Sequence, residues 1–169
     1  FSDYLKPTIR MSAMMKLPVT YIFTHDSILV GQDGPTHQPV EQLGSLRMIP
    51  DFNVYRPCDY KELIGSWNEI LASGTASALV LPRNHTETLE FTNPSGVFYG
   101  AYIISEVKIS LDVIIIATGS EVELAMKLKD ELMKNSYHTY TNVRLIKRDV
   151  MNAFVDLVDV NNIWNDYTE

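Results

Sequence analysis

Short apolar runs rich in β-branched and aromatic residues recur along the chain, and stretches with apolar residues at helical spacing lie between them. The runs predict strands at residues 19–23, 53–56, 77–81, 100–104, 112–118 and 143–146. The helical spacing predicts helices at residues 1–16, 39–49, 120–134 and from residue 59 onward. Strands that alternate with helices across short loops indicate an α/β protein, with a parallel sheet covered by helices on both faces.

The first predicted helix carries an apolar residue at every fourth position, namely Phe1, Leu5, Ile9 and Ala13. Residues at this spacing share one face, which we expect to pack on the core. Pro7 has no amide hydrogen to donate, so the regular part of this helix is expected to begin near Lys6.

Two later helices begin at capping signals. Asp59 and Glu62 have capping-box spacing, and Ser120 with Glu123 has the full capping-box pattern. The first of these helices is expected to pack through Leu63, Trp67, Ile70 and Leu71. The second is expected to pack through Val122, Ala125, Met126, Leu128, Leu132 and Met133.

Composition and charge exclude several classes of protein. The 169 residues suffice for one domain, or for one and part of another. A net charge of −7 argues against non-specific binding to nucleic acid, which needs a basic face. No apolar run reaches the length of about 18 residues that a membrane span needs.

The single cysteine and the ends of the chain bear on its location. Cys58 cannot form an internal disulfide, which fits a reducing compartment, and we expect it to be a packed residue near a helix start. The sequence has no secretory signal, so a cytoplasmic location is expected. It begins at Phe1 with no initiator methionine, and we expect it to be a piece of something longer.

A polar loop at residues 24–39 lies between the first strand and the next helix. It contains His25, Asp26, Asp33 and His37, and loops at the carboxyl ends of parallel strands are where ligands bind in open α/β sheets. From the residues alone, three interpretations stay open: a solvated turn, a zinc or iron site, and a site for an organic ligand held by convergent polar groups.

The string His25-Asp26-Ser27, followed by residues 31–41 (Gly-Gln-Asp-Gly-Pro-Thr-His-Gln-Pro-Val-Glu), closely resembles the signature of transketolases. These thiamine-diphosphate enzymes move two-carbon ketol units between sugars. The resemblance continues through residues 1–4, 56–59, 78–83, 100–102 and 117–122, and fades after about Asn135. It implies a pyrimidine-binding domain at residues 1–84, a linker at 85–109 and an incomplete carboxyl-terminal α/β domain at 110–169.

The resemblance also implies roles for four polar residues. His37 matches the histidine close to the reacting carbonyl and hydroxyls, and Asp33 matches the aspartate that selects the configuration of the C2 hydroxyl. His25 and Arg83 match residues at the phosphate end of the sugar. Arg83 follows the strand at 77–81, where a guanidinium can fork onto a phosphate, although a solvated surface arginine is the plainer alternative. His85 has no such support and is expected to be a surface residue.

Phe1 and Tyr4 match aromatic residues that line the pocket for the aminopyrimidine ring of thiamine diphosphate in this family. Aromatic faces suit a flat heterocycle. Periodicity alone favours a place in the core for both side chains.

The chain also departs from the family. Leu29, Gln32 and Pro82 stand where many relatives have other residues, and the Gly-Asp-Gly…Asn motif that holds the diphosphate through magnesium or calcium is absent. The divalent metal is therefore expected on the amino-terminal domain, and this chain should not turn over alone. The resemblance implies sugar phosphates as substrates, and a second copy or a complementary amino-terminal half as partner.

Two alternatives stay open. One is dihydroxyacetone synthase, a close relative that uses formaldehyde as acceptor. The other is a non-catalytic interaction module that keeps the fold.

Overall fold

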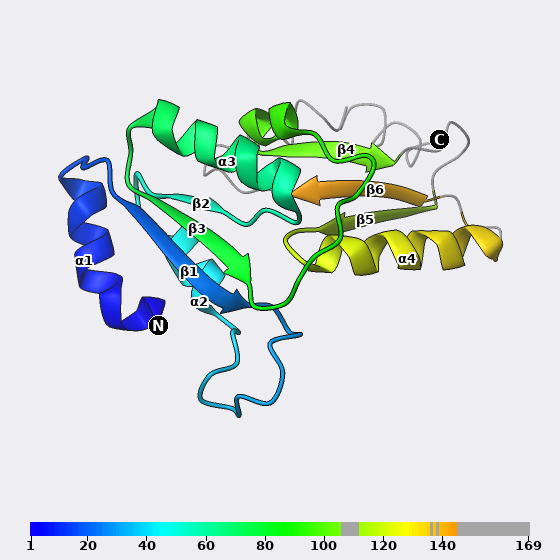
Figure 1. Cartoon of the computed structure of the whole chain (residues 1–169), viewed down its shortest axis with the longest axis horizontal. Coiled ribbons are helices and arrows are strands. Elements are labelled where there is room, and N and C mark those ends of the chain that lie inside the picture. The colour runs from blue at the N-terminus through cyan, green and yellow to red at the C-terminus, as the bar shows by residue number, and fades with distance from the viewer. Residues whose placement is uncertain (106–111, 136, 138, 145–169) are drawn as a thin grey trace, which may run out of the picture.

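The computed structural model describes residues 1–105, 112–135, 137 and 139–144. Two three-stranded sheets lie side by side, each with its own covering helices (Figure 1). We call the part around the first sheet the first unit, and the part around the second sheet the second unit. Within the described ranges, every helix is too short or too polar to cross a membrane.

The first sheet is parallel and has the strand order β1-β3-β2. Its strands are β1 (Thr20–Asp26), β2 (Asn53–Tyr55) and β3 (Ser77–Pro82). The central strand aligns Ala78 with Tyr21 on one side and with Val54 on the other. Because the three strands run the same way, their carboxyl ends meet at one edge, as the sequence predicts.

Helices cover both faces of this sheet. The helices α1 (Ser2–Met14) and α2 (Gln42–Arg47) pack on one face, where Ile9 and Leu46 meet Ala78 and Val80. The helix α3 (Tyr60–Ser73) and the 3₁₀ helix η1 (Pro94–Tyr99) cover the other face, where Ile70 and Val97 meet Leu79. Successive residues of β3 therefore point into two cores, which explains its unbroken apolar run.

Helix α1 differs from the prediction at its start. It begins at Ser2 and not near Lys6, with Pro7 inside it. The first amides of a helix have no intrahelical partner, so a proline this near the start removes a single hydrogen bond. The predicted apolar face is right only in its second half: Ile9 is fully buried, but the exposed fractions of Phe1 and Leu5 are 86% and 39%.

Helix α2 is shorter than predicted. It begins at Gln42, three residues after Pro39. The Gln42 side-chain oxygen accepts the Val40 amide at 2.8 Å, a local turn that competes with the helix.

Helix α3 buries only part of its predicted face: Ile70 is buried and Leu63 packs against the same core, as predicted. Trp67 and Leu71 are 40% and 65% exposed, so their predicted burial is wrong. The buried stripe contains the small residues Gly65 and Ser66 instead. The backbone of η1 approaches so closely at Pro94 that no Cβ fits at Gly65.

The predicted cap of α3 is confirmed and extends into the second unit. Asp59 Oδ1 accepts the Glu62 amide at 3.0 Å, and Glu62 Oε2 accepts the Cys58 amide at 2.8 Å. The Tyr102 hydroxyl, from the second unit, donates to Glu62 Oε1 at 2.6 Å. Burial raises the pKa of Glu62, although the Tyr102 and Cys58 hydrogen bonds act to lower it. Cys58 is buried, as expected.

The second sheet has the order β4-β6-β5 and is mixed. Its strands are β4 (Ala101–Ser105), β5 (Val113–Ala117) and β6 (Thr139–Arg144); β6 is antiparallel to β4 and parallel to β5. Helix α4 (Glu121–Lys134) packs on β5 and β6.

The predicted strands at 100–104 and 112–118 correspond to β4 and β5, and the one at 143–146 overlaps the end of β6. Residues 145–169, which include the end of that strand and the rest of the predicted second domain, lie outside the described residues. The domain boundaries stay a prediction, although η1 and β4 both lie in the predicted linker.

We predict that Asp59→Ala lowers the free energy of unfolding by about 2–4 kcal/mol, because it removes the helix cap and a buried acceptor. Asp59 Oδ2 also accepts the Thr92 hydroxyl at 2.5 Å and the Leu89 amide at 3.1 Å. Urea unfolding measures the loss. The matched control is Asp130→Ala, whose side chain is 66% exposed and whose effect should stay below about 0.5 kcal/mol. Equal losses for the two variants would contradict the role of Asp59.

Candidate functional site

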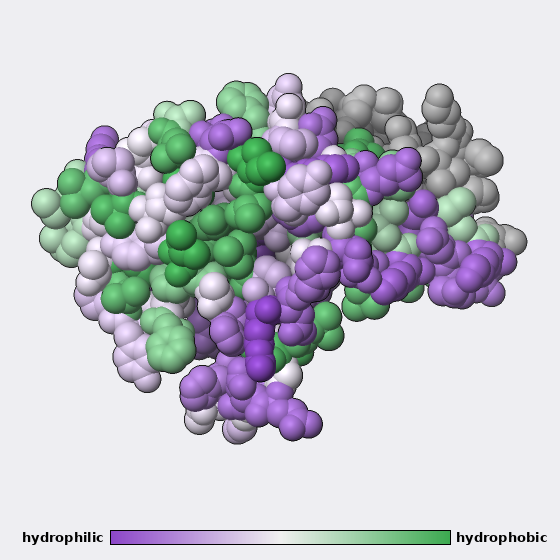
Figure 2. Space-filling model, viewed as in Figure 1, coloured by the Kyte–Doolittle hydropathy of each residue, from purple (hydrophilic) through white to green (hydrophobic). Residues whose placement is uncertain are grey.

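The carboxyl edge of the first sheet carries the polar residues that the sequence singled out. The loop from β1 to α2 extends from this edge, and Arg83 follows β3 at the same edge (Figure 1). Figure 2 shows hydrophilic residues gathered on this loop, below the apolar surface of the first unit. Ligands bind at this edge in open α/β sheets.

The loop begins with a turn at residues 25–30, which we call the His25 turn. His25 and Ser27 have φ values of +65° and +124°, in the left-handed range that residues with a Cβ rarely adopt. The Ser27 hydroxyl oxygen accepts the Leu29 amide at 3.0 Å, and the Ser27 carbonyl accepts the Val30 amide at 3.2 Å. A strained backbone of this kind persists only where its surroundings hold it, since each such residue costs about 1–3 kcal/mol.

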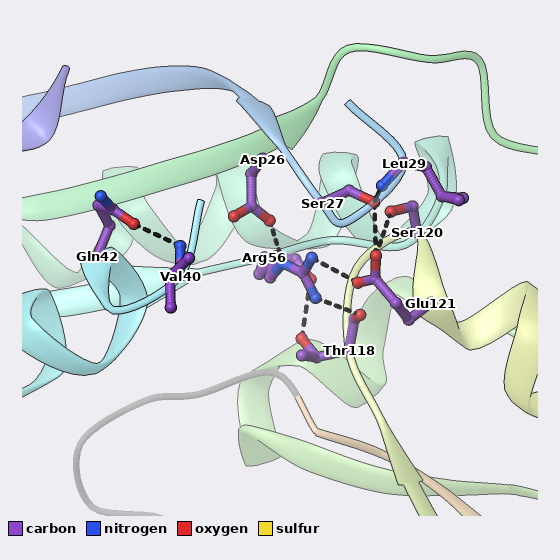
Figure 3. Close-up of polar contacts among 9 residues, drawn as sticks. All are labelled: Asp26, Ser27, Leu29, Val40, Gln42, Arg56, Thr118, Ser120 and Glu121. Carbon is purple, nitrogen blue, oxygen red and sulfur yellow. Dashed lines mark hydrogen bonds and ion pairs between the residues drawn. The ribbon is translucent and has the colours of Figure 1, made fainter. Parts of the chain in front are cut away.

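A buried arginine lies behind the His25 turn (Figure 3). Arg56 directly follows β2, is 6% exposed, and forms an ion pair through Nε with the Asp26 carboxylate. Its Nη2 lies 2.5 Å from Glu121 Oε2, and its Nη1 donates to the Thr118 carbonyl at 2.6 Å. Asp26 belongs to the first unit, and Thr118 and Glu121 to the second, so one guanidinium binds both units.

Glu121 also contacts the His25 turn directly. Its Oε1 accepts the Ser27 hydroxyl at 2.6 Å and the Ser120 hydroxyl at 3.1 Å. Burial acts to raise the pKa of Glu121, but the Ser27 hydroxyl and the Arg56 guanidinium outweigh it and hold the pKa below its ordinary value.

The predicted capping box of α4 is wrong. Ser120 has helical backbone angles, and its side chain makes no cap hydrogen bond. Its hydroxyl instead donates to Glu121. Glu123, the expected other half of the box, pairs with Lys127 at 2.6 Å.

The structure brings Asp33 and Arg83 together. Asp33 Oδ1 lies 3.7 Å from Arg83 Nη1, which also donates to the Val30 carbonyl at 3.0 Å. The neighbouring Asn84 donates to the Leu29 carbonyl at 2.8 Å. The Arg83 side chain is 47% exposed, so part of it lies open to solvent.

The structure also brings His37 to the aromatic residues at the start of α1. The Phe1 ring centroid lies 6.2 Å from that of His37, edge to face, and 6.2 Å from that of Tyr4. Phe1 and Tyr4 are 86% and 84% exposed, which overturns the alternative that they belong to the core. Their rings are accessible to a flat ligand.

His25 is exposed at the end of β1, with Nδ1 2.9 Å from the Thr24 hydroxyl oxygen. Within the described ranges, no hydrogen bond or ion pair joins it to the Asp33–Arg83 pair or to His37. His85 is on the surface, as expected, 3.9 Å from Glu87. The same ranges contain no group of three or more His, Cys, Asp and Glu side chains that would hold a metal ion, so the zinc or iron alternative finds no ligand set there.

Sequence reasoning missed Arg56 and Glu121. In the sequence, Arg56 stands only as the end of a predicted strand and as part of a family motif. One available signal was a charged residue directly after a short apolar strand, at the sheet edge that also carries the polar loop. Glu121 occurs in the sequence only within the family motif at residues 117–122. Its contacts with Arg56 and Ser27 join residues far apart along the chain, and no local pattern signals them.

Comparisons with known proteins agree with this architecture. A family model described as the transketolase pyrimidine-binding domain matches residues 1–88, and one described as the transketolase-like C-terminal domain matches residues 100–145. A transketolase of Halalkalibacterium halodurans is 49% identical over 142 residues, which are 82% of this chain and 21% of that protein. The chain therefore spans about a fifth of the length of the curated relatives it matches.

Solved structures are also similar. A transketolase from Leishmania mexicana has a TM-score of 0.81 and 39% identity, over 85% of this chain and 21% of that one. A split-gene transketolase, described as an inactive beta4 tetramer, has a TM-score of 0.69 over 84% of this chain and 44% of that one. It is 22% identical and so shows a shared fold.

We predict that Glu121→Gln lowers the free energy of unfolding by about 1–3 kcal/mol at pH 7, because it removes charge-assisted bonds to Arg56 and Ser27. The pKa of Glu121 is lowered in the folded protein, so its stabilisation is present above the ordinary carboxyl pKa of 4.5 and is lost as the pH falls. The difference between variant and parent should therefore shrink below about pH 4.5 in urea unfolding. A difference that stays constant down to about pH 3 would contradict the pairing.

Proposed function

Because this chain belongs to the transketolase family, we propose that it contributes to thiamine-diphosphate-dependent transfer of two-carbon ketol units from ketose phosphates to aldose phosphates. We also propose that this activity belongs to the pentose phosphate pathway and is cytoplasmic. The activity is proposed for the assembled enzyme, and the chain alone is expected to be inactive.

One observation carries the proposal. A single loop brings Asp33 beside Arg83 at one end and His37 beside Phe1 at the other. The Gln38 amide closes this loop by donating to the Gly31 carbonyl at 3.0 Å. Groups that suit a sugar phosphate and groups that suit a flat ring thus contact the same loop, through Asp33 and His37.

The exposed aromatic residues fit the proposed cofactor. Phe1 and Tyr4 offer accessible ring faces, and His37 lies against Phe1. We propose that Phe1 and Tyr4 hold the aminopyrimidine of thiamine diphosphate. When bound, the cofactor supplies a carbon nucleophile and an electron sink.

The polar residues orient the sugar. Arg83 uses Nη1 for the Val30 carbonyl, which leaves its Nε and Nη2 for a phosphate, with His25 as the second phosphate contact. Asp33 accepts a hydrogen bond from the substrate's C2 hydroxyl. His37 has Nδ1 2.9 Å from the Thr36 hydroxyl oxygen, which leaves Nε2 to exchange a proton with the reacting oxygen.

The remaining parts of the site are assigned to a partner. We propose that magnesium or calcium and the diphosphate are held by an amino-terminal transketolase region, within a homodimer or on a complementary half. A solved structure described as a split-gene transketolase shares this fold.

The experiment combines the chain with a purified amino-terminal transketolase region, thiamine diphosphate and magnesium, and measures ketol transfer from xylulose 5-phosphate to ribose 5-phosphate. Transfer that requires both proteins supports the proposal. A demonstrably assembled but inactive complex would contradict it and favour the non-catalytic module. Activity restricted to formaldehyde as acceptor would instead indicate dihydroxyacetone synthase.

In the same assay, we predict that Asp33→Ala lowers kcat/KM about tenfold and weakens the preference between the two C2 epimers of the acceptor aldose, because one aligned hydrogen bond is lost. Asp130→Ala, on α4, is the matched control and should leave both unchanged. Unaltered kinetics and stereochemical preference in Asp33→Ala would remove Asp33 from the site.

A further inference from the structure

The two halves of the His25 turn are held by different parts of the molecule. The downstream half is fixed within the first unit, where Arg83 and Asn84 donate to the carbonyls of Val30 and Leu29. The upstream half contains Asp26 and Ser27, both buried at 8% and 4% exposure.

The partners of the upstream half lead into the second unit. Asp26 pairs with Arg56, and Arg56 pairs with Glu121 at the start of α4. Ser27 donates to the same Glu121 carboxylate at 2.6 Å. Figure 3 shows Asp26, Arg56, Glu121 and Ser27 as one connected chain of contacts.

The backbone before α4 is shaped around this arginine. Gly119 has a φ of +60°, and a Cβ at this position would lie 2.7 Å from Arg56 Cζ. The Gly119 amide donates to the Arg56 carbonyl at 3.2 Å. The second unit thus contacts Arg56 both through its backbone at Gly119 and through the Glu121 side chain.

We propose that Arg56 and Glu121 are positioning residues, which hold the strained His25 turn in place from the second unit and so set where His25 meets the substrate. For its catalytic consequence this inference rests on the proposed function. The second unit then contributes to substrate binding through the turn, without touching the substrate.

The first experiment measures amide hydrogen exchange in the chain itself. Glu121→Ala removes the acceptor of Ser27 and one partner of Arg56, so the amides of Leu29 and Val30 should exchange about tenfold faster. This acceleration is measured relative to amides in the middle of β3, whose rates rise only with the loss of global stability. Glu121→Gln, which keeps the shape and loses the charge, should give a smaller change in the same amides.

The matched control is Glu131→Ala, on the same helix, which removes an exposed ion pair to Lys134. It should leave the exchange of Leu29 and Val30 unchanged. Equal acceleration of β3 and turn amides in Glu121→Ala would mean a general loss of stability, and no acceleration would mean no support from Glu121. Either result would overturn the proposal.

The second experiment measures kinetics in the enzyme reconstituted with its amino-terminal region. Glu121→Gln should raise KM for xylulose 5-phosphate about tenfold with kcat within about twofold, because the phosphate contact is misplaced. For unphosphorylated xylulose, kcat/KM should stay within about twofold. An equal loss with both donors would contradict a positioning role. If the parent enzyme is itself inactive, the proposed function fails, while the exchange experiment still decides whether Glu121 holds the turn.

Discussion

A buried guanidinium needs charged and polar partners inside the protein. Arg56 takes these partners from both units, so its contacts connect the two sheets. The carboxylates of Asp26 and Glu121 and the Thr118 carbonyl supply those partners. A buried charge left with no partner typically costs about 3–5 kcal/mol, and the second carboxylate at Arg56 keeps the loss of either one below this cost. The close approach of Gly119 follows from the same contact, because a side chain there would displace the arginine.

The buried and the exposed charges of this edge have different tasks. Arg56 and Asp26 are satisfied within the protein and are almost closed to solvent. Arg83 and Asp33 lie 3.7 Å apart and are about half and one-third exposed, which leaves them open to a ligand. The buried Arg56–Asp26 pair thus supports the loop, and the more exposed Arg83–Asp33 pair lies on its accessible side. Arg83 and Asp33 contact each other and Arg83 also donates to the Val30 carbonyl, but part of each side chain stays exposed to solvent.

The strands were predictable because a short run of β-branched and aromatic side chains indicates a buried strand without reference to distant residues. Their parallel order then predicted that the carboxyl ends of the first three strands meet at one edge of the sheet. Asp33 and His37 lie on the predicted loop and Arg83 lies at the neighbouring sheet edge, while the substrate roles that the family motif implies for them stay a prediction. The predictions for α3 and α4 were wrong where contacts between residues far apart in the sequence determine the local structure. Ser120 has a capping pattern, yet its hydroxyl donates to Glu121, whose position depends on an arginine from another unit. Trp67 has the spacing of a core residue, yet close packing of η1 selects the small-residue face of α3.

The most direct test of the account is a double-mutant cycle between Asp26→Asn and Glu121→Gln, measured by urea unfolding of the two single variants and the pair. The two carboxylates come from different units and share the Arg56 guanidinium, so the account predicts a coupling free energy of about 0.5–3 kcal/mol. The control pair, Asp26→Asn with Glu131→Gln, should be additive. Additivity of Asp26→Asn with Glu121→Gln, within about 0.3 kcal/mol, would contradict the claim that this arginine joins the two units.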